Sequence, residues 1–235
     1  MTKILALDTS TDACSVALTI DGVANHIFEL AAKSHTQRLL PMVDEILRAA
    51  NCRLQDLDAI AYGRGPGSFT GLRICMGVVQ GLAFGANLPV IPISTLQAMA
   101  QGFLTENPNT TLPLLVALDA RMNEIYWGVF TADKNPQALS DEYVMKPTDV
   151  CEQNIVQSLD KKFIAIGPGW HYADLQTIAP AQLVQNFYPN AKDILSLALD
   201  AFAQGKSMSI LDAQPVYLRD SVSWKKRERI RPQPR

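Results

Sequence analysis

The sequence predicts an α/β fold with a mixed β-sheet flanked by helices. Apolar runs of strand length alternate with segments that show helical spacing, an order typical of α/β proteins. Tight-turn signals separate the strands that open the chain, which predicts antiparallel pairing there and makes the sheet mixed. A buried strand, an aspartate, a loop and a second strand occur at 3–20 and again, in outline, at 112–131. The two halves of the chain are therefore expected to be related.

Three strands open the first half, and strands and helices alternate after them. The first strand is a continuous apolar run that ends on Asp8, and Asp21-Gly22 is a hairpin signal between the second and third. Ser34 is a candidate N-cap for the next helix, which Pro41 is expected to kink. The expected elements are strands 3–8, 14–20 and 23–31, helix 34–50, strand 58–63, the Gly/Pro loop 64–71, helix 70–86, strand 88–93 and helix 94–104.

The polar, proline-containing stretch 105–111 is the expected boundary between the halves. The elements expected after it are strands 112–119, 124–131, 141–146, 163–166 and 214–218, a Gly-Pro-Gly turn at 167–169, and helices 147–158, 170–178 and 190–205. We predict an N-terminal lobe (1–104), a C-terminal lobe (105–218) and a basic tail (219–235). Helix 190–205 is a candidate to pack back on the N-terminal lobe.

The charge is distributed unevenly along the chain. The net charge is −2, which argues against a dedicated nucleic-acid binder, but residues 219–235 carry +5 and the remainder carries −7. The tail offers an indole for stacking and cations for phosphate, or it is a solvated chain end; both interpretations stay open. The residues of the tail that are candidates for tRNA contact are Trp224, Lys225, Lys226 and Arg227.

The cysteines and the apolar stretches favour a cytoplasmic protein with no membrane span. The four cysteines are scattered without C-x-x-C spacing, so neither disulfides nor a zinc site are expected. Residues 74–105 carry no charge and resemble a membrane span, but Gln80, Asn87, Pro89 and Pro92 interrupt them. A buried helix followed by a buried strand is the expected structure.

Two short motifs have the composition of a nucleotide cleft. Asp8, Thr9 and Ser10 end the first strand and offer hydroxyls and a carboxylate to a phosphate or to a metal-bound water. Gly65 and Gly67 belong to a Gly-Pro-Gly loop that joins a strand to a helix N-terminus, a position that favours anions. A self-capping polar turn and a tight structural turn are the alternatives, and the sequence does not decide between them.

Three glycines recur every fourth residue on the helix 70–86. Gly77, Gly81 and Gly85 each cost about 1 kcal/mol of helix stability relative to alanine, so a compensating close approach of another helix is expected. That helix could be internal, namely 34–50, or could belong to another subunit.

Residues that commonly perform catalysis are scarce. His26, His35 and His171 have no second metal ligand at i+3 or i+4, and no H-E-x-x-H or G-x-S-x-G motif occurs. The sequence therefore predicts neither a catalytic residue nor a metal site.

Four segments closely resemble the bacterial TsaB family, also called YeaZ. They are I-L-A-L-D-T-S-T at 4–11, C-S-V-A-L at 14–18, G-R-G-P-G-S-F-T-G-L-R-I at 63–74 and P-V-Y-L-R at 215–219. The resemblance implies the actin-like ATPase (ASKHA) architecture of two related lobes. It also implies a role in forming N6-threonylcarbamoyladenosine at position 37 of tRNAs that read codons beginning with A.

The resemblance further implies partners. TsaB-like proteins pair with the catalytic sibling TsaD, joined by the ATPase TsaE, and reach tRNA through the complex; alone, the same helices could form a homodimer. The subunit contact is a bundle of the first two helices of each partner. On this sequence the implied interface residues are Ser34, His35, Leu39, Met42, Ile46, Arg73, Gly77, Gly81 and Gly85.

The resemblance also implies that the sibling has two metal-binding histidines at the positions of Thr95 and Met99 in this sequence. A hydroxyl and a thioether do not replace two imidazoles as ligands of a divalent metal ion. The chain is thus expected to be a pseudo-enzyme that requires no cofactor, although a nucleotide could be held at the interface with its partners. The family has at times been classed with M22-type peptidases, and we interpret that classification as one carried over from the sibling TsaD. The rival hypothesis is an autonomous ATPase or peptidase that uses the cleft between the lobes.

Overall fold

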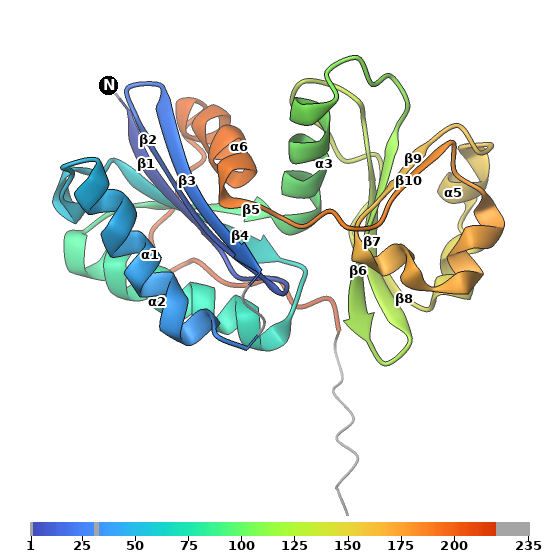
Figure 1. Cartoon of the computed structure of the whole chain (residues 1–235), viewed down its shortest axis with the longest axis horizontal. Coiled ribbons are helices and arrows are strands. Elements are labelled where there is room, and N and C mark those ends of the chain that lie inside the picture. Colours follow the sequence, from blue (N-terminus) through green and yellow to red (C-terminus); the bar gives the residue numbers. More distant parts are fainter. Residues whose placement is uncertain (1, 31–32, 220–235) are drawn as a thin grey trace, which may run out of the picture.

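Two five-stranded sheets lie side by side in the computed structural model, which describes residues 2–30 and 33–219 (Figure 1). The strands are β1 (Lys3–Asp8), β2 (Ala13–Ile20), β3 (Val23–Leu30), β4 (Ala59–Gly65), β5 (Val90–Ser94), β6 (Leu114–Arg121), β7 (Glu124–Phe130), β8 (Tyr143–Met145), β9 (Ile164–Ile166) and β10 (Gln182–Val184). The α-helices are α1 (His35–Ala49), α2 (Phe69–Ala86), α3 (Thr95–Glu106), α4 (Pro147–Cys151), α5 (Asn154–Ser158) and α6 (Ala191–Ala203).

The two sheets have the same topology. In the first sheet the order is β3-β2-β1-β4-β5, with β1–β2 and β2–β3 antiparallel and β1–β4 and β4–β5 parallel. In the second sheet β8-β7-β6-β9-β10 repeats that order and those directions strand by strand. The predicted duplication is therefore confirmed, and the architecture is that of the actin-like ATPases.

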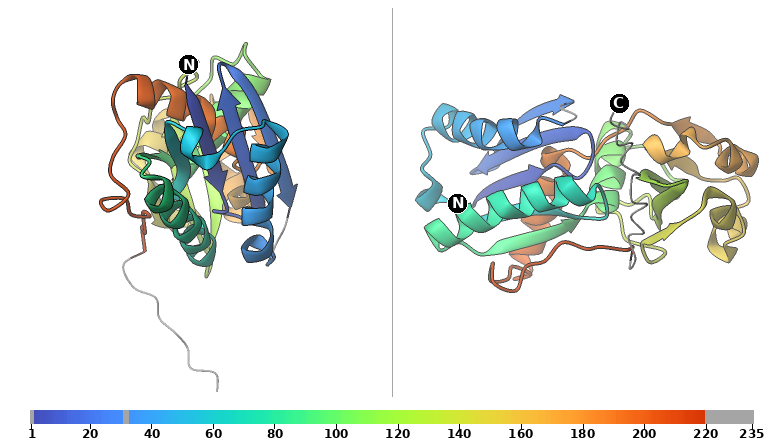
Figure 2. Two further views of the ribbon diagram at one scale, coloured as in Figure 1. Left: turned by 90° about the vertical axis from the view of Figure 1, so that its left-hand side faces the viewer. Right: turned by 90° about the horizontal axis from the view of Figure 1, so that it is seen from below.

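Helices cover both faces of the first sheet. Leu5, Leu7 and Val16 point to one face, where the buried sides of α1 and α2 pack side by side (Figure 2). Ile4 and Ala6, which alternate with them along β1, point to the opposite face. That second face is covered by α6, which comes from the end of the chain.

The last helix of each half packs on the other half. In the first half this is α3, whose Leu96, Met99 and Phe103 join the core of the second sheet. In the second half it is α6, whose Ile194 and Leu197 join the core of the first sheet. The two helices also contact each other between the sheets (Figure 1). The boundary at 105–111 therefore separates the strands of the two lobes but not their cores.

The structure corrects three expected elements and adds two that were not expected. Residues 214–218 form no strand; the segment is extended and Val216 N donates one hydrogen bond to Arg64 O, at 2.7 Å. Helix 147–158 is broken into α4 and α5. The expected helix 170–178 is two 3-10 helices, Pro168–His171 and Ala173–Ile178. Strand β10 and the 3-10 helix Leu54–Asp56 were not expected.

Helix α2 is long and apolar enough to cross a membrane by length and composition, although the core helices of globular proteins pass the same test. It lies on the first sheet with Cys75, Met76 and Val79 in the core, as expected for a buried helix. Only 33% of the helix is buried, so the expectation of a buried helix holds for one side of it, and the described residues leave the other side uncovered.

The exchange of helices predicts where a mutation in α6 acts. We expect Ile194→Ala, at a fully buried position, to lower the free energy of unfolding by about 2–5 kcal/mol. Because the side chain packs on the first sheet, amide exchange should accelerate in β1 and β4, more than 100 residues away in sequence. Urea unfolding and hydrogen exchange measure the two effects. Faster exchange confined to β9 and β10 would contradict the assignment.

Candidate functional site

The two loops with nucleotide-cleft composition are packed against each other. Thr9 Oγ1 donates to Gly71 O at 2.8 Å, and Ser68 N donates to Ser10 O at 2.7 Å. A Cβ atom on Gly67 or Gly71 would collide with the backbone carbonyl of Ser10 or of Thr9. The glycines of this loop therefore permit contact between two loops of the same chain, and the backbone groups that would cradle a phosphate are partly used in that contact.

Asp8 lies beneath these loops and is fully buried. Its Oδ2 accepts hydrogen bonds from Ser10 N (3.1 Å) and Ser10 Oγ (2.9 Å), while Oδ1 is buried without a hydrogen-bond partner among the described residues and abuts Gly63. Burial raises the pKa of the Asp8 carboxyl from 3.8 to about 7, and the hydrogen bonds from Ser10 oppose that rise only in part. The Asp8 carboxyl is therefore enclosed between β1 and β4 and is not displayed in an open cleft.

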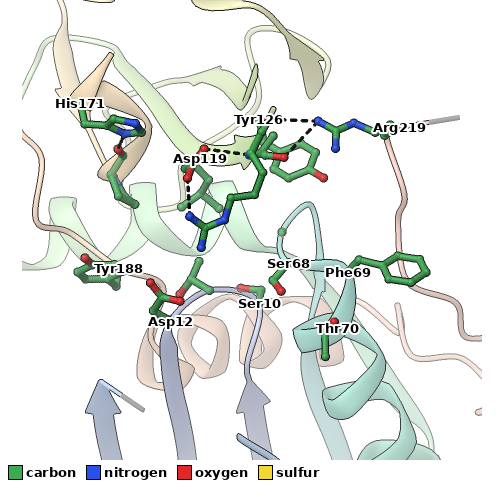
Figure 3. A pocket seen from close by; sticks show the side chains of 16 residues that line it. Ser10, Asp12, Ser68, Phe69, Thr70, Asp119, Tyr126, His171, Tyr188 and Arg219 are labelled. Carbon is green, nitrogen blue, oxygen red and sulfur yellow. Dashed lines mark hydrogen bonds and ion pairs between the residues drawn. The ribbon is translucent and has the colours of Figure 1, made fainter. Parts of the chain in front are cut away.

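A pocket of about 380 Å³ opens between the lobes above the loops (Figure 3). Of the five candidate cleft residues, Ser10 and Gly67 line it, whereas Asp8, Thr9 and Gly65 do not. Hydroxyls and aromatic rings from both lobes make up much of the wall. The lining residues are Ser10, Thr11, Asp12, Gly67, Ser68, Phe69, Thr70, Leu118, Asp119, Ala120, Arg121, Tyr126, Pro168, His171, Tyr188 and Arg219. The expectation that all five residues form one cleft surface is thus wrong for three of them.

Both arginines of the pocket already have acidic partners. Arg121 pairs with Asp119 at 3.1 Å, and Arg219 pairs with Glu124. Asp119 also accepts a hydrogen bond from Tyr172 OH at 3.1 Å. The described residues contain no group of three His, Cys, Asp or Glu side chains that could hold a metal ion. The pocket is therefore polar, with no uncompensated arginine to attract a triphosphate.

The two residues expected in place of metal-binding histidines, Thr95 and Met99, both lie fully buried inside the fold. The Met99 methyl group lies against Gly167, and a Cβ atom added to Gly167 would come within 2.7 Å of that methyl carbon. The thioether thus fills the space between α3 and the turn after β9 with apolar atoms.

The structure corrects the interface residues that were expected on α1. His35, Leu39, Met42 and Ile46 are buried in the chain's own core, and His35 Nε2 lies 3.2 Å from Ala13 O. Their i, i+4, i+7, i+11 spacing marks the core-facing side of the helix. Ser34 occupies the N-cap position, half-buried. The outer side of α1 instead presents residues such as Leu40, Pro41 and Asp44.

The glycines of α2 lie on its uncovered side. A Cβ atom on Gly77, Gly81 or Gly85 would meet nothing within 4 Å, so these glycines do not serve a close approach to α1, and the internal alternative is wrong. Phe84 stands beside them with 75% of its surface exposed. Arg73, expected on the same face, is exposed with its guanidinium over the Phe69 ring. We call Gly77, Gly81, Phe84 and Gly85 the glycine face.

Two sets of polar contacts near the boundary between the lobes were not anticipated. Glu142, in the loop before β8, accepts from Arg64 of β4 at 3.1 Å and from Ser94 at the start of α3. Arg219 donates to Ala120 O at 3.1 Å and pairs with Glu124, across the hairpin turn after β6. The conspicuous P-V-Y-L-R segment was a signal for the second contact. Trp224, Lys225, Lys226 and Arg227 lie outside the described residues.

Comparisons with known proteins give a consistent result. A family model described as TsaD: tRNA N6-adenosine threonylcarbamoyltransferase matches residues 25–230. The chain is 47% identical to the tRNA threonylcarbamoyladenosine biosynthesis protein TsaB of Escherichia coli, over 95% of this chain and 97% of that protein. Its identity to the Haemophilus influenzae protein of the same name is 43%, over 95% and 96%. YeaZ from Pseudomonas aeruginosa, a solved structure, is 42% identical with a TM-score of 0.86, over 93% of this chain and 100% of that one.

The buried carboxyl predicts a pH-dependent difference in stability. Between about pH 4 and pH 7 the unfolded chain releases the Asp8 proton while the folded chain retains it, because the pKa in the folded state is about 7. The free energy of unfolding therefore falls as the pH rises through this range. Above about pH 7 both states have lost the proton, and the destabilisation no longer grows. Asp8→Asn has no such proton. We expect its stability relative to the natural chain to rise by up to about 1.4 kcal/mol per pH unit over that range and then to level off. Urea unfolding at pH 5, 6, 7 and 8 tests this, and a pH-independent difference would refute it.

Proposed function

The chain belongs to the TsaB (YeaZ) family of tRNA threonylcarbamoyladenosine biosynthesis proteins, and we propose that it serves there as a non-catalytic subunit that binds and stabilises TsaD. The product is N6-threonylcarbamoyladenosine at position 37 of tRNAs that read codons beginning with A. The chain works in the cytoplasm, requires no cofactor of its own, and helps to recruit the ATPase TsaE. It reaches tRNA within the complex.

The glycine face is the observation that carries the proposal. Three glycines in one helix lower its stability, and no contact among the residues that the structure describes compensates for them. The face lies on a largely apolar helix beside α1, so a partner's helices can approach the α2 backbone closely. A second copy of the chain fits the same face when TsaD is absent, which gives a two-fold homodimer.

The cleft supports a non-catalytic role. The loops after β1 and before α2 close on each other, Asp8 is buried, and the arginines of the pocket are paired with carboxylates. The rival function, an autonomous ATPase or peptidase, would need a nucleophile activated by a base within the pocket. His171 of the described pocket has its Nδ1 2.7 Å from Pro168 O, and the Ser10 hydroxyl donates to the Asp8 carboxyl, which is buried and does not line the pocket.

Bulk on the glycine face should separate partner binding from folding. We expect Gly81→Leu to abolish co-purification with TsaD, while the isolated chain stays folded, with an unchanged circular dichroism spectrum, because the added side chain meets no atom of its own chain within 4 Å of Cβ among the described residues. Gln157→Leu places the same side chain on exposed α5 in the other lobe and should leave the complex intact. Normal complex formation by Gly81→Leu would refute the interface.

A turnover assay separates the subunit from the rival enzyme. We expect the isolated chain to hydrolyse ATP and unfolded casein no faster than a buffer control, and Asp8→Asn to behave in the same way. Turnover that co-purifies with the chain through successive columns and disappears in Asp8→Asn would establish the rival and exclude the non-catalytic assignment.

A further inference from the structure

Two aromatic rings are exposed together at the start of α2. Phe69 is the first residue of the helix, and Tyr217 belongs to the extended segment near the end of the chain. Their ring centroids are 5.3 Å apart with the planes tilted by 48°, and the residues are 46% and 42% exposed. Phe69 lines the edge of the interlobe pocket, and Figure 3 shows its ring turned away from the centre of that pocket.

Arg73 completes this group and is unusual among the arginines. Its guanidinium carbon lies 3.9 Å from the Phe69 ring centroid, and its Nε donates to Tyr217 OH at 3.4 Å. No carboxylate lies within 4 Å of it in the described part of the chain. The other six described arginines all form ion pairs with carboxylates: Arg38, Arg48, Arg53, Arg64, Arg121 and Arg219. Arg73 therefore presents an uncompensated charge on an aromatic surface.

The most basic stretch of the sequence starts beside this group. Arg219, two residues after Tyr217, is fixed by Glu124 and by Ala120 O. Residues 220–235 then carry six Lys/Arg against two acidic residues, and include Trp224. The remaining 219 residues carry a net charge of −6. An anionic partner is thus attracted to this end of the chain and repelled by most of the rest.

We propose that Phe69, Arg73 and Tyr217 form a stacking platform for unpaired RNA bases, with the net positive charge of residues 220–235 adding to the attraction of the RNA. The inference deepens the proposed function, since it assigns this subunit a direct contact with the tRNA on which the complex acts. Aromatic rings and the guanidinium plane bind unstacked bases of any sequence, and a cationic segment binds the backbone. An acidic protein surface would use the charges but would leave both exposed rings without a stacking partner.

Fluorescence anisotropy of the full chain, alone and with TsaD, tests the platform. The probes are a labelled 17-nucleotide RNA hairpin with a seven-nucleotide loop and a blunt RNA duplex of the same stem, at several KCl concentrations. We expect tighter binding of the hairpin, a loss of about tenfold or more with Tyr217→Leu or Arg73→Gln, and no change for the duplex with Tyr217→Leu. Removal of 220–235 should weaken both probes and flatten the salt dependence.

Three controls make the result decisive. Lys162→Gln removes one exposed cation in the other lobe and should leave hairpin binding unchanged. Tyr217→Phe keeps the ring and should retain hairpin binding, so a loss with Tyr217→Leu is not explained by the hydroxyl. Tyr217→Leu should still co-purify with TsaD, and Gly81→Leu should still bind the hairpin, which separates this inference from the subunit interface.

Several outcomes would overturn the proposal. They are no hairpin binding by the natural chain, equal binding of hairpin and duplex, or unchanged hairpin binding by Tyr217→Leu with melting temperature preserved. Polyglutamate that displaces the hairpin as effectively as unlabelled hairpin does would also overturn it, because the surface would then recognise acidic chains in general and fit a protein partner.

Discussion

The exchange of terminal helices between the two halves is the constraint on which the rest of the structure depends. The α2 side of the first sheet is closed by local helices, but its opposite face needs α6 from the far end of the chain. The second sheet needs α3 in the same way. Helices α3 and α6 contact each other between the sheets, and Glu142 of the second lobe accepts hydrogen bonds from Arg64 and Ser94 of the first. Lobe geometry is thus set by buried apolar packing, with polar contacts added to it.

The positions of the strands along the chain and the duplication could be predicted because they follow from local sequence patterns. Apolar runs, hairpin turns and the repeated strand–aspartate opening are local features, and most strands and long helices lie within two residues of their expected bounds. Half of the helix exchange was predicted: helix 190–205 was a candidate to pack on the N-terminal lobe, and α6 does so. The packing of α3 on the second sheet was not predicted, because periodicity identifies an apolar side of a helix without saying which sheet it meets. Short elements failed for a related reason. Residues 214–218 have strand composition, but their backbone makes one hydrogen bond to β4 and no ladder.

The candidate site was predicted only in part. Gly67 and Gly71 allow the backbone to approach either a phosphate or another loop, because each kind of approach requires that the residue has no Cβ atom. The glycine motif therefore did not distinguish a phosphate-binding loop from a loop that packs on another loop. On α1, spacing identified an apolar side but not whether it met the core or a partner; His35, Leu39, Met42 and Ile46 face the core. The glycines of α2 were more informative. Three helix-weakening residues on one side indicate a contact, and the open space around them in the structure excludes an internal one.

The exchanged helices also govern how the chain folds during synthesis. The strands of the first sheet leave the ribosome well before α6 exists, so one apolar face of that sheet stays uncovered until nearly 200 residues have been made. Folding of this protein is therefore mostly a post-translational event with long-range closure, and nascent chains expose β1 and β4 to chaperones or to one another in the interval. Slow codons or a stall between α3 and α6 would lengthen that exposure, whereas the same pause after α6 would not.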